Sequence, residues 1–281
     1  MTPKIGFMQG RLCDQVDGKI QAFPWDDWQD EFSVAEVINM SAMEWTLDQE
    51  NLYNNPLMTK EGQRKINALS SIHHVAIPSL TGDCFMQAPF WKSCADLQSE
   101  LQKDFLAVCG SCSAVRIEMI VVPLVDNGCL ENREQEDRLV NFLLSHEKFF
   151  AQENIKILFE SDFEPLNFKR FINRFQGDSF GINYDIGNSA ALGFDPRDEF
   201  AAYGSRIVNV HVKDRVRGGT TVPLGSGSAD FEFVLSEFNR AKYSGNYILQ
   251  TARAANGDHA SAIAKYRDMV LDWVAESKHS Y

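Results

Sequence analysis

Short apolar runs alternate along the chain with longer segments in which hydrophobic and polar residues are mixed. The runs are nearly continuous in hydrophobic residues, which is typical of strands buried on both faces of a parallel sheet. They predict strands at residues 4–8, 43–47, 75–80, 115–122, 155–160, 180–185, 207–213 and 246–251.

The longer segments carry apolar residues at helical spacing. Between 134 and 152, for example, Leu139, Phe142, Leu143, Phe149 and Phe150 mark one face of a helix. The same kind of pattern predicts helices at residues 33–40, 60–71, 95–109, 134–152, 168–174, 197–203, 231–241 and 260–276.

A strand followed by a helix, repeated around the chain in this way, is typical of a closed barrel. The competing fold is an open doubly wound sheet, but no Gly-x-Gly-x-x-Gly turn follows the first strand. The 281 residues also suit such a barrel, which typically needs about 250. We therefore predict an α/β fold, a single (β/α)8 TIM barrel that forms one domain over residues 1–281.

Polar side chains interrupt the last four apolar runs near their C-terminal ends. Glu160, Asp185, His211 and Gln250 stand there, separated by 25, 26 and 39 residues. Each interval has room for a crossover helix and its loops, so the four side chains are expected on consecutive strands around one rim. In barrels of this kind that rim carries the active site.

Two carboxylates, an imidazole and an amide oxygen form a mixed oxygen and nitrogen ligand set. Such a set suits one divalent metal ion, Mn²⁺, Mg²⁺, Co²⁺ or Zn²⁺, and leaves positions open for substrate oxygens. Purely structural polar groups are a poorer explanation for all four, because a buried polar side chain costs free energy unless it is paired. We predict a metal site formed by Glu160, Asp185, His211 and Gln250.

Several segments resemble the sugar phosphate isomerase/epimerase family, which has a xylose-isomerase-like barrel. The resemblance covers nearly the whole chain, and the order of the segments carries it more than any one of them. It implies that Glu160, Asp185 and His211 are metal ligands, and that Glu160 is the catalytic base that removes a proton beside a carbonyl to form an enediolate. Besides Glu160, the segments are Ile-Gly-Phe-Met-Gln-Gly10-Arg11-Leu, Phe23-Pro-Trp25 with Trp28 and Glu31-Phe, Asp185-Ile-Gly-Asn188, His211-Val-Lys213-Asp214 and Pro223-Leu-Gly225-Ser-Gly227.

The chain departs from this family where the eighth strand ends. The family usually has a Glu there, in a Glu-x-x-Arg setting, whereas this chain has Gln250-Thr-Ala-Arg253. An amide can bind a metal but cannot take up a proton near neutral pH, so Gln250 cannot be the second of two opposed bases. We expect weaker metal binding and a single-base aldose–ketose isomerisation, unless a second base comes from Glu44, Glu118 or Asp162.

Six polar residues near the strand ends are candidates for substrate binding. Lys213 lies two residues after His211 and is therefore expected to point into the same layer of the barrel. Other interpretations remain open for four of the six. Arg217 could be a solvated loop cation, and Asn188 could cap a turn. Arg11 and Glu44 could form a salt bridge with each other. The six are Arg11, Glu44, Asn188, Lys213, Arg217 and Arg253.

The net charge of the chain limits the kinds of molecule that it is expected to bind. A net charge of −12 opposes nucleic-acid binding, which depends on Lys and Arg contacts with phosphates. The cations Lys213, Arg215 and Arg217 suit one small anion, so a small sugar or sugar phosphate is the predicted partner. No apolar run reaches the roughly 20 residues of a membrane span, and residues 1–5 lack the apolar segment of a signal peptide. We expect no membrane contact and a cytoplasmic location; a homo-oligomer is compatible with the sequence.

Two further functions stay open at this stage. A keto-cyclitol (inosose-type) dehydratase uses similar metal ligands, and a catalytically weak sugar-binding protein would account for the missing Glu at position 250. A DNA-repair endonuclease on the same barrel is disfavoured, because it needs a cluster of three zinc ions with additional His ligands and a basic face. The chain has only six His residues and a net charge of −12.

Overall fold

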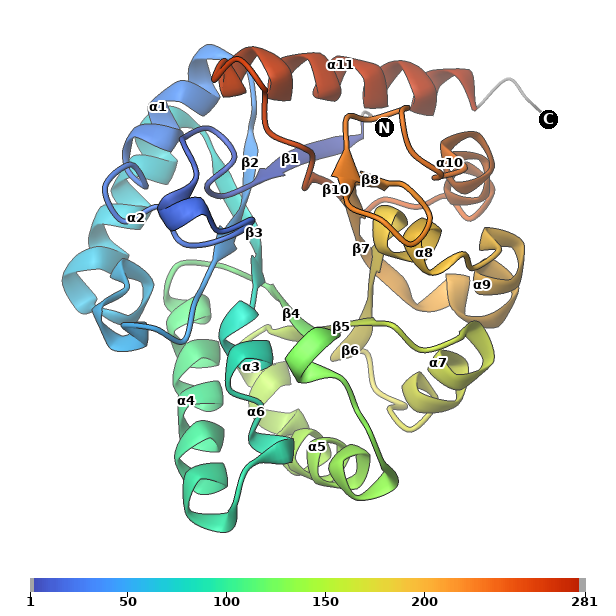
Figure 1. Cartoon of the computed structure of the whole chain (residues 1–281). Helices are drawn as coiled ribbons and strands as arrows, with labels where there is room; N and C mark the ends of the chain where they lie inside the picture. Colours follow the sequence, from blue (N-terminus) through green and yellow to red (C-terminus); the bar gives the residue numbers. More distant parts are fainter. Residues whose placement is uncertain (1–2, 278–281) are drawn as a thin grey trace.

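The apolar runs form one closed ring of parallel strands in the computed structural model, which describes residues 3–277 (Figure 1). Neighbours in the ring follow the chain from β1 to β7, and β10 closes the ring between β7 and β1. The predicted (β/α)8 barrel is confirmed. The strands are β1 (Lys4–Met8), β2 (Ala42–Thr46), β3 (Ala76–Thr81), β4 (Met119–Leu124), β5 (Lys156–Ser161), β6 (Phe180–Asp185), β7 (Ile207–Val212) and β10 (Asn246–Leu249).

Helices surround the ring and bury its outer face (Figure 1). The long α11 completes this layer next to α1, where Arg267 donates to the carbonyl oxygen of Ile38. Two short helices that the sequence pattern did not predict, α3 and α8, begin just after β3 and β6 and so border the C-terminal rim. The helices are α1 (Asp30–Val37), α2 (Lys60–His73), α3 (Asp83–Gln87), α4 (Ala95–Ala114), α5 (Arg133–Ser145), α6 (Glu147–Gln152), α7 (Pro165–Ile172), α8 (Ile186–Leu192), α9 (Pro196–Tyr203), α10 (Phe231–Arg240) and α11 (His259–Glu276).

The fourth strand begins later than predicted. Residues 115–118 form a turn instead, in which Arg116 has a left-handed backbone with φ of 64°. Glu118 therefore precedes the strand at the N-terminal end of the barrel, where it is exposed and accepts a hydrogen bond of 3.0 Å from Asn154 Nδ2. The suggestion that Glu118 is a second catalytic base is wrong, because the chemistry of such barrels lies at the opposite end.

Two further local differences concern loops. The predicted helix at 134–152 is interrupted at His146, whose backbone angles of −110° and 9° are not helical, so two helices replace one. A short antiparallel hairpin, β8 (Asp214–Arg215) with β9 (Thr221–Val222), follows β7. It folds the segment after His211 back over the C-terminal rim (Figure 1).

Aromatic rings fill the layer between the barrel and helices α3 to α6. Phe105 lies at the centre of this cluster, with its ring centroid 4.4 Å from that of Phe85, 5.6 Å from Phe142 and 6.3 Å from Phe150. Its side chain is fully buried. The ring contacts are tilted or edge-on, which is the favoured geometry for aromatic pairs.

Shortening Phe105 should therefore lower stability measurably. We expect Phe105→Leu to reduce the free energy of unfolding by about 1 to 2 kcal/mol, because the smaller side chain leaves a gap in close-packed surroundings. Urea unfolding followed by circular dichroism measures this. Phe149→Leu is the matched control, since Phe149 is only partly buried and should cost less. Equal losses in the two variants would contradict the central role of Phe105.

The inside of the barrel carries buried polar side chains from the middle of β6 and β7 up to the C-terminal rim. On β6 and β7 the inward positions alternate with positions that face the helices, as strand geometry requires. Asn183 and Asp185 thus share one face of β6, and Asn209 and His211 share one face of β7; all four are buried. Within residues 3–277, no helix combines the length and the apolar character needed to cross a membrane.

Candidate metal centre and active site

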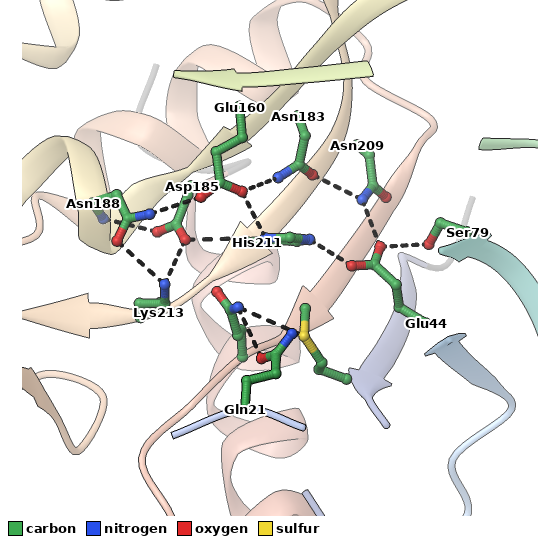
Figure 2. A network of polar contacts seen from close by, with 12 residues as sticks. Gln21, Glu44, Ser79, Glu160, Asn183, Asp185, Asn188, Asn209, His211 and Lys213 are labelled. Carbon is green, nitrogen blue, oxygen red and sulfur yellow. Dashed lines mark hydrogen bonds and ion pairs between the residues drawn. The ribbon is translucent and has the colours of Figure 1, made fainter. Parts of the chain in front are cut away.

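Glu160, Asp185 and His211 converge at the C-terminal rim, as Figure 2 shows. Ligand atoms of these buried side chains all lie within 4.8 Å of one another. His211 Nδ1 is 3.2 Å from Glu160 Oε2 and 4.0 Å from Asp185 Oδ2. Two carboxylate oxygens and an imidazole nitrogen at such distances suit a divalent cation.

Glu44 holds the other side of the His211 ring. Its Oε1 is 2.7 Å from His211 Nε2, and the carboxylate is completely buried. A carboxylate in this place fixes a proton on Nε2 and leaves the lone pair of Nδ1 directed toward Glu160 and Asp185. Glu44 itself is held by Ser79 Oγ at 2.5 Å and by Asn209 Nδ2 at 3.0 Å. Glu44 therefore orients the ring of His211, and its contact with a substrate stays a prediction.

The electrostatic surroundings of His211 favour positive charge. Burial alone would lower the pKa of His211, but the carboxylates of Glu44 and Glu160 on either side outweigh it and raise the pKa to about 10. A metal cation at Nδ1 gains the same attraction and would displace a proton on binding. The electrostatic surroundings and the positions of the ligand atoms therefore both favour a cation at His211 Nδ1.

Glu160 is an ionised carboxylate with both oxygens oriented. Asn183 Nδ2 donates to Oε2 at 2.8 Å, and Asn188 Nδ2 donates to Oε1 at 2.7 Å. Burial raises the pKa of Glu160. The neighbouring His211 and Lys213 and the hydrogen bond from Asn183 lower it by more than burial raises it, so the net shift is downward. The ionised form is the one in which a carboxylate can act as a general base.

Asp185 connects the candidate metal centre to helix α8 and to Lys213. Its Oδ1 accepts a hydrogen bond of 2.8 Å from the backbone N–H of Asn188, which caps the first turn of α8. Its Oδ2 is 2.7 Å from Lys213 Nζ, which also donates to Asn188 Oδ1 at 3.2 Å. Lys213 and Asn188, both predicted to bind substrate, thus lie directly beside the three candidate ligands.

Gln250 follows β10 directly, and β10 is the neighbour of β7 in the ring. Its Nε2 donates to Gln21 Oε1 at 3.2 Å and faces Met8 Sδ at 3.6 Å. Its Oε1 is buried and has no hydrogen-bond partner among the described residues. A buried acceptor in this condition requires a donor or a cation. That Gln250 is the fourth metal ligand remains a prediction. The unpaired Oε1 atom is consistent with it.

The remaining predicted substrate residues lie farther along the rim. Arg11 donates to the carbonyl oxygen of Ile20 at 2.8 Å and to Gln21 Oε1 at 3.2 Å, and it makes no salt bridge with Glu44. Arg253 donates to the carbonyl oxygen of Gly10. Both guanidinium groups therefore hold the loop after β1.

The cations of the loop after β7, Arg215 and Arg217, lie in different positions. Arg217 is exposed, and its backbone N–H donates to Ser228 Oγ at 3.1 Å. Arg215 instead points inward and donates to Asn188 Oδ1 at 2.8 Å. Its place in the β8–β9 hairpin, which the apolar pattern does not reveal, explains the difference.

Two residues of the site gave no signal in the sequence interpretation. Gln21 comes from the loop after β1 and Asp83 from the first residue of α3, and Gln21 Nε2 donates to Asp83 Oδ2 at 3.1 Å. A polar residue just after an apolar run is the signal that could have identified Asp83, since Gly82 alone separates it from β3. Asp162, which was considered as a base, is exposed beyond the end of β5.

Comparison with known proteins agrees with this architecture. The model of the xylose isomerase-like TIM barrel family matches residues 32–269. A curated relative, L-ribulose-5-phosphate 3-epimerase UlaE of Escherichia coli O1:K1, is 35% identical over 108 residues. That match spans 38% of this chain and 38% of the length of the relative.

Solved structures share the fold at low sequence identity. A xylose isomerase domain protein from Planctomyces limnophilus superimposes with a TM-score of 0.76 at 14% identity, over 99% of this chain and all of that one. The IolI protein, whose crystal structure has a binding zinc atom, gives a TM-score of 0.75 at 15% identity over 98% of this chain and 99% of its own. At these identities the likeness concerns the fold.

Proposed function

Because the chain belongs to the xylose isomerase-like TIM barrel family, we propose that it is a divalent-metal-dependent isomerase or epimerase of a small sugar or sugar phosphate. The observation that carries this proposal is the buried group of Glu160, Asp185 and His211, in which Glu44 turns His211 Nδ1 toward the two acids. The matched segment of an L-ribulose-5-phosphate 3-epimerase favours a ketose phosphate as substrate.

The chain's own residues account for the positions of the reacting groups. Glu160, Asp185, His211 and the orphaned oxygen of Gln250 would hold the cation. When bound, the cation polarises the carbonyl and hydroxyl oxygens of the sugar, so that a proton on the adjacent carbon becomes acidic. Glu160, kept ionised by its neighbours, removes that proton to leave an enediolate.

Cationic side chains suit the rest of an anionic substrate. Arg253 Nε and Nη1 and Arg11 Nε are buried and have no hydrogen-bond partner among the described residues. Spare guanidinium donors of this kind bind phosphate or hydroxyl oxygens well. We infer that Arg11 and Arg253, together with Lys213, orient the substrate over Glu160.

Exchange of substrate hydrogen with solvent tests the function directly. The protein is incubated in D₂O with Mn²⁺ and with L-ribulose 5-phosphate, L-ribulose or other ketoses, aldoses and their phosphates, and NMR follows deuterium at the carbon beside the carbonyl. Incorporation that EDTA abolishes and Mn²⁺ restores is the expected result. A sugar-binding protein without catalysis would bind these ligands and show no exchange with any of them.

Restoring a carboxylate at position 250 probes the fourth ligand. We expect Gln250→Glu to tighten Mn²⁺ binding by about tenfold, equivalent to about 1.4 kcal/mol, because the orphaned oxygen would then carry negative charge. Calorimetric titration measures the affinity. Gln21→Glu is the matched control, since it adds the same charge next to Gln250 at a residue not assigned as a ligand. Unchanged affinity in the position-250 variant would remove Gln250 from the ligand set.

A further inference from the structure

Asp83 stands at the rim across the barrel from His211. The ring order places β3 opposite β7, and Asp83 follows β3 after the single residue Gly82. A Cβ atom at Gly82 would lie 2.4 Å from the Phe85 ring and 2.8 Å from the carbonyl oxygen of Val121. Only glycine therefore lets the chain turn this tightly, and the turn places Asp83 at the rim.

A hydrogen-bonded bridge joins Asp83 to the position where the second Glu is missing. Gln21 donates through Nε2 to Asp83 Oδ2 at 3.1 Å and accepts through Oε1 from Gln250 Nε2 at 3.2 Å. Arg11 adds a hydrogen bond of 3.2 Å to the same Oε1. Within residues 3–277, no group donates a hydrogen bond to the other oxygen of Asp83, Oδ1, so this atom is available to a ligand.

Charged groups from several elements face Asp83. Burial raises its pKa, as do the charges of Asp48 after β2 and Glu160 on β5, while the Gln21 hydrogen bond and His211 on β7 lower it; the result is about 7. The guanidinium of Arg11, after β1, also interacts with it. Both protonation states of Asp83 are therefore accessible at neutral pH, as a catalytic acid or base requires.

We propose that Asp83 is the second acid/base of this enzyme and delivers the proton that Gln250 cannot. The assignment rests on the proposed function. Glu160 accepts the proton from the carbon beside the carbonyl and the electron pair moves into the enediolate. The carboxyl group of Asp83 then gives its proton to that carbon on the face opposite Glu160, which re-forms the carbonyl and inverts the carbon. Each catalytic cycle leaves Glu160 protonated and Asp83 ionised, and proton exchange with water restores both groups.

Solvent exchange separates the two proton transfers. We expect Asp83→Asn to lower formation of the product epimer from L-ribulose 5-phosphate by about a hundredfold. The substrate pool should still exchange its hydrogen for deuterium in D₂O with Mn²⁺, because Glu160 continues to remove and return the proton on its own side. Asp48→Asn is the matched control: it removes the same charge beside Asp83 and should change neither rate by more than a few-fold.

Two further measurements exclude a merely structural effect. Asp83→Glu keeps a carboxyl group and should form more epimer than Asp83→Asn. The wild type and both Asp83 variants should bind Mn²⁺ with equal affinity, because Asp83 is not a ligand. Parallel loss of exchange and epimer formation in Asp83→Asn, or wild-type epimer formation in that variant, would overturn the assignment while leaving the proposed function standing. Absence of exchange in the wild-type protein with every sugar would overturn the proposed function, and the assignment with it.

Discussion

Glu160→Gln is expected to lower turnover of a ketose or its phosphate by about 10²- to 10⁴-fold, the usual contribution of a positioned general base. The amide has nearly the shape of the carboxylate and keeps one oxygen that can accept from Asn183 or from Asn188, but it cannot take up a proton. Initial rates and deuterium incorporation at the substrate carbon, both measured with saturating Mn²⁺, report the loss.

Asp162→Asn is the appropriate comparison for this variant. Asp162 is an exposed carboxylate two residues farther along the same segment, so the change in net charge is identical. Its turnover should stay within about twofold of the wild type, as is usual for surface substitutions away from a site. If Glu160→Gln retained hydrogen exchange at the wild-type rate, another residue would have to be the base.

Glu44→Gln should weaken Mn²⁺ binding by about 10- to 100-fold, the typical effect of losing a residue that orients a metal ligand. The side-chain NH₂ that this substitution introduces would face His211 Nε2 and donate to it. The ring proton then moves to Nδ1, so the nitrogen that faces Glu160 and Asp185 loses its lone pair. Calorimetric titration with Mn²⁺ measures the effect.

Ser79→Ala serves as the control for Glu44→Gln. It removes one hydrogen bond to the Glu44 carboxylate and leaves the contact with His211 intact. We expect wild-type Mn²⁺ affinity and a loss of stability of about 1 kcal/mol. Equal weakening of Mn²⁺ binding in both variants would mean that the buried polar group as a whole, and not the ring proton, determines affinity.

The last four strands were the part of the molecule that the sequence described best. A parallel barrel brings the C-terminal ends of its strands together, so Glu160, Asp185 and His211 could be placed at one rim from the apolar runs alone. The roles of Glu44 and Asp83 could not be predicted in this way. Glu44 lies in the middle of an apolar run, and its contact with His211 spans 167 positions of the chain.

Loops account for most of what the apolar pattern missed. Gln21 and Arg215 reach the site from segments without periodicity, and their directions depend on contacts with Asp83, Gln250 and Asn188 that only the folded chain provides. The apolar pattern also failed to predict the start of β4. There Arg116, with a left-handed backbone, follows the end of α4 and delays the beginning of the strand.

The buried carboxylate of Glu44 also has a consequence for how the polypeptide reaches its folded form. Its hydrogen-bond donors Asn209 and His211 are synthesised long after β2, and without them a dehydrated negative charge would stand in the centre of the molecule at a cost of several kcal/mol. Fragments that end before residue 207 should therefore stay open and hydrated around β2. A folded half-barrel would leave this carboxylate with Ser79 as its hydrogen-bond donor and without its two partners on β7.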